Sequence, residues 1–142
     1  MREIITEITI AAPPEKVWEI LMDFPSYGDW NPFVTAIDGE SKVGEQLAAS
    51  LRLPGGKTRG FKPKVTAVEP ERLFQWFGKV GFDALFGGRH SFRLSPTEHG
   101  TRFEHSERFT GVLASMMFSM MGRRTEAGFR AMNDALKARS EG

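Results

Sequence analysis

The 142-residue sequence contains no cysteine and has almost no excess charge of either sign. The lack of cysteine excludes disulfide bonds, thiolate metal sites and cysteine nucleophiles. Lysine and arginine number 19 against 18 aspartates and glutamates, so the formal net charge is +1. Such a balance gives no general attraction to nucleic acids or acidic membranes, and we expect no nucleic-acid partner.

Long apolar runs are also missing. No uncharged run approaches the roughly 18 apolar residues of a spanning helix, and the first residues, MREIITEITI, lack the pattern of a signal peptide. We therefore expect a cytoplasmic protein without stable membrane insertion, built as a single domain over 1–142 because this length supports one core. No metal or cofactor is predicted, and the chain is expected to be a monomer or homodimer.

Alternating apolar residues predict seven strands, and short turns between most of them predict antiparallel pairing. Two short helices are expected after the first strand, one from about Pro14 to Asp23 and one of a single turn within FPSYGDWNPF. The PGGK stretch after Leu53 lacks the spacing of a phosphate-binding loop and is read as a hairpin turn. The strands are expected near 3–10, 33–38, 45–53, 59–69, 72–79, 88–95 and 101–110.

The segment after Gly111 has no proline and has apolar residues at helical spacing, which predicts one long C-terminal helix. Gly122 and Gly128 within it indicate a bend or a close approach to the sheet. The stripe consists of Leu113, Met117, Met121, Gly128, Met132 and Leu136. The fold class is therefore α+β, with a curved seven-stranded antiparallel sheet wrapped around this helix and a pocket between them.

Three stretches resemble the START-like helix-grip superfamily (SRPBCC), in particular its polyketide cyclase/dehydrase and lipid-transport branch. They are ITIAAPPEKVWEILMDFPSYGDWNPF, GRHSFRLSPTEHGTRFEHSERFTG and RRTEAGFRAMNDALKAR. The resemblance covers essentially the whole chain and implies a helix-grip fold with a hydrophobic cavity. It specifies activity poorly, because the superfamily includes lipid carriers, hormone receptors, cyclases, ring-hydroxylase subunits and chaperone activators.

The hairpin formed by the last two strands has polar groups on its apolar face. In TRFEHSERF, His105 and Glu107 alternate in phase with Phe103 and Phe109, and His90 lies on the same face of the preceding strand. Inward positions pair with inward positions, so His90 is expected opposite His105 or Glu107.

Three roles are open to this cluster. The histidines and Glu107 are candidate acid–base catalysts, a device for binding the polar end of a ligand, or a self-satisfied hydrogen-bonded group in the core.

Further candidate ligand contacts are aromatic and methionine side chains expected to face the cavity. Methionine adapts to varied apolar shapes, but it also fills irregular cores and partner surfaces. Trp30 is read either as a lid aromatic at the cavity rim or as simple packing. The complete set of candidate ligand-binding residues is Trp30, Phe74, Trp76, His90, Phe92, Phe103, His105, Glu107, Met117 and Met121.

The predicted function is binding or carriage of a small hydrophobic ligand, such as a lipid, a polyketide-like molecule or an aromatic compound. One alternative is a cyclase/dehydratase-type enzyme that uses His90, His105 or Glu107 as acid and base. The other is a protein-interaction module like the chaperone activators, which an exposed methionine-rich helix would favour. Whether the chain is an enzyme stays open at this level.

Overall fold

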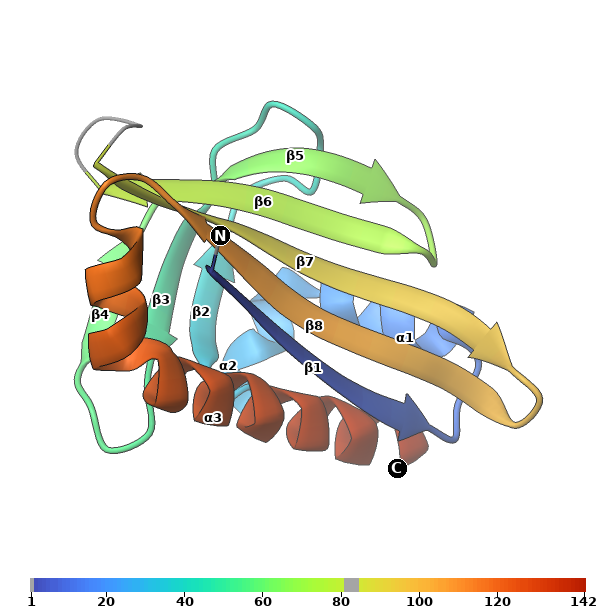
Figure 1. The fold of residues 1–142 in the computed structure, drawn as a ribbon. Coiled ribbons are helices and arrows are strands. Elements are labelled where there is room, and N and C mark those ends of the chain that lie inside the picture. Colours follow the sequence, from blue (N-terminus) through green and yellow to red (C-terminus); the bar gives the residue numbers. More distant parts are fainter. Residues whose placement is uncertain (1, 81–84) are drawn as a thin grey trace.

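A computed structural model of the chain describes residues 2–80 and 85–142. Within these residues the chain forms eight strands, three α-helices and one short 3-10 helix, η1 (Figure 1). In chain order the elements are β1 (Arg2–Ile10), α1 (Pro14–Met22), η1 (Phe24–Ser26), α2 (Tyr27–Trp30), β2 (Val34–Asp38), β3 (Ala48–Arg52), β4 (Thr58–Phe61), β5 (Lys64–Glu69), β6 (Leu73–Val80), β7 (Phe86–Thr97), β8 (Gly100–Thr110) and α3 (Ala114–Glu141).

The strands form two antiparallel sheets, which corrects the expected single sheet of seven strands. One sheet has the order β1-β8-β7-β6-β5 and the other has the order β2-β3-β4. The strand expected at 59–69 is two strands, because the chain leaves β4 after Phe61 and begins β5 at Lys64. Pro63 lies between them and has no N–H to donate to a sheet. β4 pairs with β3, whereas β5 pairs with β6.

The two sheets meet where β5 begins. The backbone N–H of Leu47 donates to the carbonyl of Pro63 at 2.8 Å, and the N–H of Val65 donates to the carbonyl of Glu45 at 2.9 Å. A single antiparallel bridge between Gln46 and Lys64 lies at the same place. The three-stranded sheet is therefore joined to the larger one by a short seam rather than by a continuous ladder.

The helices confirm the expected α+β arrangement of a sheet with a long C-terminal helix. α1 begins at Pro14, where a missing N–H needs no partner, and ends at Met22. Figure 1 shows α3 running alongside β1 and β8, with β3 and β4 near its N-terminal part. Its predicted stripe is buried at Gly128, Met132 and Leu136, so this part of the helix completes the core.

Gly128 makes the close approach that the sequence indicated. A Cβ at this position would lie 2.6 Å from Cδ1 of Phe33, which is shorter than carbon atoms tolerate. Phe33 in turn packs against Phe129, with ring centroids 5.3 Å apart. The glycine thus lets α3 lie directly against the segment that enters β2.

Candidate functional site

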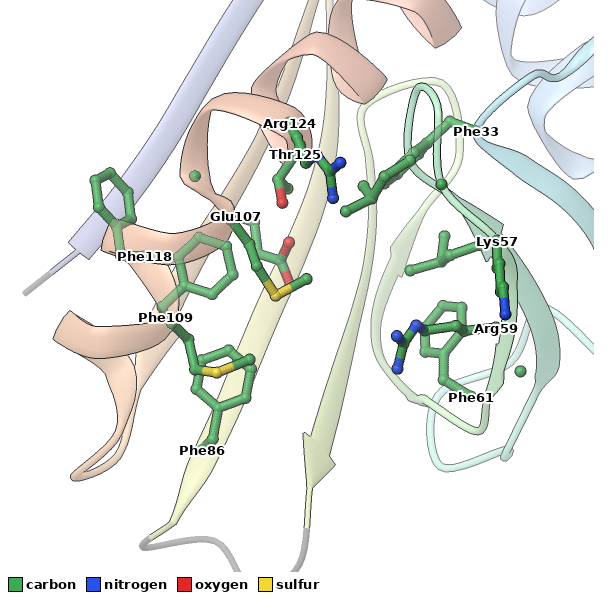
Figure 2. A pocket seen from close by; sticks show the side chains of 17 residues that line it. Phe33, Lys57, Arg59, Phe61, Phe86, Glu107, Phe109, Phe118, Arg124 and Thr125 are labelled. Atoms are coloured by element: carbon green, nitrogen blue, oxygen red, sulfur yellow. The ribbon is translucent and has the colours of Figure 1, made fainter.

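A cavity of about 340 Å³ lies between the β3–β4 hairpin, the ends of β7 and β8, and the N-terminal part of α3 (Figure 2). This volume falls in the range of small-molecule sites. Most of its lining is aromatic or aliphatic, namely Phe33, Leu51, Leu53, Phe61, Phe86, Phe109, Met117, Phe118 and Met121. The pocket therefore presents an apolar surface that is assembled from both sheets and the helix.

Five polar side chains also line the cavity. Figure 2 shows Glu107, Thr125 and Arg124 on the side of β8 and α3, with Lys57 and Arg59 on the facing hairpin. The two residues on the hairpin and Arg124 are exposed, whereas Thr125 is buried and the Glu107 side chain is only 18% exposed. The three cationic residues are thus more exposed to solvent than the other two.

Glu107 owes its position to a missing side chain on the neighbouring strand. Gly88 lies beside it on β7, and a Cβ at that residue would collide with Oε2 of Glu107. The carboxylate therefore occupies the space above a glycine and reaches the pocket wall.

Three of the sequence-predicted ligand contacts line this pocket. Glu107 comes from β8, and Met117 and Met121 come from α3, where they lie one helical turn apart. Trp30 does not line it. That side chain is half-buried in α2 against Tyr27, with ring centroids 5.3 Å apart, and its buried indole N–H has no hydrogen-bond partner among the described residues.

The structure places the other six predicted contacts in the packed core. These residues are Phe74, Trp76, His90, Phe92, Phe103 and His105. Each is 2% exposed or less, and their rings pack against one another on the larger sheet. Phe129 from α3 stacks on His105 with centroids 4.1 Å apart, which closes the space over the middle of this sheet. The open volume consequently lies beyond them, toward the start of α3.

The two histidines and Glu107 come together as the hairpin register predicted. His90 lies opposite Glu107, which confirms the expected pairing. Nδ1 of His90 is 3.7 Å from Oε1 of Glu107, and Nε2 of His90 is 2.6 Å from Nε2 of His105. The Glu107 carboxylate on the pocket wall thus lies beside His90, and His90 is hydrogen-bonded to the buried imidazole of His105.

The hydrogen bonds at the buried end of this side-chain network determine where the protons lie. The Thr6 hydroxyl donates to the carbonyl of His105 at 2.9 Å, so its oxygen accepts from Nδ2 of Asn133 at 2.8 Å. Oδ1 of Asn133 then accepts from Nδ1 of His105 at 2.9 Å. Nε2 of His105 is consequently an acceptor, and Nε2–H of His90 donates to it. In neutral His90, Nδ1 is left as an acceptor that faces Glu107.

Burial lowers the pKa of His105 well below its ordinary value, and the neighbouring His90 lowers it further. The hydrogen bond to Asn133 opposes this effect but does not overcome it. His105 therefore remains neutral and acts as a fixed acceptor for His90.

Sequence reasoning missed Thr6 and Asn133 as members of this network. Thr6 was visible as a polar residue on the apolar face of the first strand, and Asn133 directly follows Met132 of the helical stripe. It also missed Lys57, Arg59 and Phe61. The turn of their hairpin was predicted, but not that the hairpin and α3 line the same pocket. The only local signal there was an aromatic residue in an otherwise polar strand.

Residues 2–80 and 85–142 contain neither a metal-binding cluster nor a membrane-spanning helix. In this part of the chain no three histidine, aspartate or glutamate side chains gather in a way that could hold a metal ion. Over the same residues, no helix combines the length and apolar character required to cross a membrane.

Solved structures of several proteins are similar to this chain over nearly its whole length. The Zhui aromatase/cyclase from Streptomyces sp. R1128 has a TM-score of 0.79 and 16% identity, covering 99% of this chain and 93% of that one. Protein CV1439 from Chromobacterium violaceum has a TM-score of 0.77 and 17% identity, covering 100% and 99%. Protein Ms6760 from Mycobacterium smegmatis has a TM-score of 0.79 and 18% identity, covering 96% and 89%. At these identities the likeness concerns the fold.

The sequence comparison is more specific than the structural one. No curated protein matches the sequence significantly. The family model described as polyketide cyclase/dehydrase and lipid transport matches residues 1–141. This match, the two-sheet fold around α3 and the apolar pocket agree with one another, and the chain belongs to the polyketide cyclase/dehydrase and lipid transport family.

Proposed function

We propose that this protein binds a small hydrophobic ligand in the pocket between the β3–β4 hairpin and α3. The observation that carries the proposal is the apolar lining of a cavity of about 340 Å³. Burying apolar ligand surface against such a wall is favourable by about 25 cal/mol per Å². Family membership supports the same function, because its description includes lipid transport.

The methionines of α3 support a pocket that adapts to its ligand. Met117 and Met121 line the cavity, and their unbranched side chains can change rotamer at low cost. Met116 and Met120 alternate with them and are 50% and 69% exposed, so they point away from the pocket. The methionine-rich segment thus has one pocket face and one solvent face.

This difference between neighbouring methionines provides the test. The uncharged fluorescent probe N-phenyl-1-naphthylamine should bind the wild-type protein, with its fluorescence rising as it leaves water. Met121→Trp should fill the cavity and weaken binding by about tenfold or more, which is about 1.4 kcal/mol. Met120→Trp adds the same indole to the outer face and should leave the affinity unchanged. Equal effects of the two substitutions, or no probe binding at all, would refute the proposal.

A second candidate function is proton transfer on the bound ligand, supported by the 3.7 Å approach of His90 to Glu107 on the pocket wall. The Glu107 carboxylate would accept a proton from a carbon next to a ligand carbonyl, with His90 beside it to stabilise the added proton. The proton would return to another atom of the ligand, so that no oxidant or reductant is needed. A relative of the same fold, the Zhui protein, is named an aromatase/cyclase.

Hydrogen–deuterium exchange tests this second candidate. In deuterium oxide, 1-tetralone loses its C2 protons slowly, and proton NMR follows the loss. A working base should accelerate exchange, and Glu107→Gln should remove about 10²–10⁴-fold of that acceleration. Glu104→Gln, on the opposite face of β8, serves as the control. If the Glu107→Gln protein exchanges tetralone as fast as wild type, Glu107 is not a base.

A further inference from the structure

The charges around the pocket are unbalanced although those of the whole chain are not. Lys57, Arg59 and Arg124 line it, against one carboxylate, Glu107, among the described lining residues. Three positive charges and one negative charge leave a local excess of two, compared with +1 for the entire 142-residue sequence. This local excess of positive charge favours anions at the pocket.

The three cations are also without partners within the described residues. None of them has a carboxylate within ion-pair distance there, Glu107 included. Elsewhere several basic residues are paired, for example Arg102 with Glu7 and Lys137 with Glu141 at 2.6 Å. Glu107 instead lies against His90. The pocket thus holds positive charges that no side chain among residues 2–80 and 85–142 neutralises.

Two of these cations face each other across the cavity. Figure 2 shows the guanidinium group of Arg59 directed inward from the hairpin and that of Arg124 directed inward from α3. Guanidinium groups donate paired hydrogen bonds to carboxylates, phosphates and sulfonates, and such charge-assisted bonds are stronger than neutral ones. An anionic group between them would contact both walls at once.

We infer that the ligand is an amphipathic anion, and this inference rests on the proposed pocket function. Its carboxylate, phosphate or sulfonate group lies between Arg59 and Arg124 at the exposed end, close to Lys57. Its apolar body lies against the aromatic and methionine side chains farther in. Glu107 and Thr125 are the less exposed polar residues of the lining; beside Glu107 a second anionic group would be repelled, and a hydroxyl group of the ligand could donate a hydrogen bond.

Two probes with the same ring system separate charge from hydrophobicity. The anion 1-anilinonaphthalene-8-sulfonate differs from N-phenyl-1-naphthylamine only in its sulfonate. We expect the wild-type protein to bind the anion about tenfold more tightly or better at low salt. In about 1 M sodium chloride, where the Debye length is about 3 Å, the advantage should largely disappear.

Charge-removing variants locate the effect. Arg59→Gln combined with Arg124→Gln should remove the preference, so that the two probes bind this variant with affinities within about twofold of each other. Arg123→Gln, next in sequence to Arg124 but outside the pocket lining, is the matched control and should retain the preference. All three side chains are exposed, so these variants should fold as the wild type does.

Each result has a defined meaning. Equal affinity of wild type for the two probes, or a salt-independent preference, overturns the inference while the uncharged probe still supports the pocket. A preference that Arg123→Gln weakens as much as the double variant does also overturns it. Failure of both probes to bind overturns the proposed function and the inference together. Loss of the preference in the double variant alone supports the inference.

Discussion

His105 shows how one buried residue limits the conditions under which the chain stays folded. Its ring is enclosed by Phe129 of α3, Phe92 of β7 and Phe103 of its own strand. The imidazole is hydrogen-bonded to His90 and Asn133, and the Glu107 carboxylate lies on the other side of His90. None of the contacting groups carries a negative charge to compensate a proton on this imidazole.

Stability should therefore fall on acidification. In the unfolded chain His105 takes up a proton below about pH 6.5, whereas in the folded protein its lowered pKa keeps it neutral. Protons thus favour the unfolded state, and the free energy of unfolding should decrease by up to about 1.4 kcal/mol per pH unit below that value from this residue. Urea unfolding at a series of pH values between about 7.5 and 5 measures the slope.

Two variants assign the slope to this residue. His105→Gln should flatten it by up to one proton, even though the variant is less stable overall. His99→Gln removes an exposed histidine of the β7–β8 turn and should leave the slope as in wild type. Identical slopes for wild type and His105→Gln would show that His105 is not the titrating group.

For individual residues, the sequence predicted the pairing of His90 with Glu107 but not the rest of the hydrogen-bond network. Strand alternation and a short turn were enough to predict that His90 and Glu107 meet, because both depend on local pairing. The link to Asn133 depends on how α3 is rotated against the sheet, which alternation in a strand does not determine. Ligand contact by His90 and His105 was expected from the same pattern, but packing by Phe129 encloses them.

Among the elements, α3 carries two glycines with opposite surroundings. At Gly128 an added Cβ would meet the buried Phe33 ring at 2.6 Å. At Gly122 the nearest atoms belong to Phe118 at 3.6 Å, an ordinary contact distance. The same helix therefore tolerates a methyl group at one position and not at the other.

Alanine substitutions at these positions should change stability in opposite directions. Gly122→Ala should raise the free energy of unfolding by up to about 1 kcal/mol through helix propensity alone. Gly128→Ala should lower it despite the same propensity gain, because overpacking costs about 1–3 kcal/mol. Urea unfolding of the two variants beside wild type tests this. A Gly128→Ala protein as stable as wild type would show that Phe33 moves away without cost.

Element prediction succeeded where periodicity was strong and failed at one proline. The long helix and the hairpin of the last two strands were expected close to their observed places. The segment 59–69 reads as one continuous strand in sequence, yet Pro63 divides it between two sheets. The alternation of apolar and polar residues does not indicate where one strand ends and the next begins, so it does not show that the two halves of this segment pair with different strands.

For the molecule as a whole, the predicted cavity exists but its position depends on contacts between distant segments. Phe33 and Phe129 are far apart in the sequence, yet their rings pack against each other in the core. The open space is left between the β3–β4 hairpin and the first turns of α3. Family resemblance predicted a hydrophobic cavity, but only the packing shows which residues line it and that three of them are cations.

Gly88 determines the direction of the Glu107 side chain although it does not itself line the pocket. The carboxylate of Glu107 rests where a side chain at residue 88 would stand, and Gly88 itself does not line the pocket. A single methyl group on this neighbouring strand would redirect the acid while leaving every wall residue unchanged. For the proposed ligand-binding function, selectivity would therefore depend on a position behind the pocket wall as well as on the wall itself.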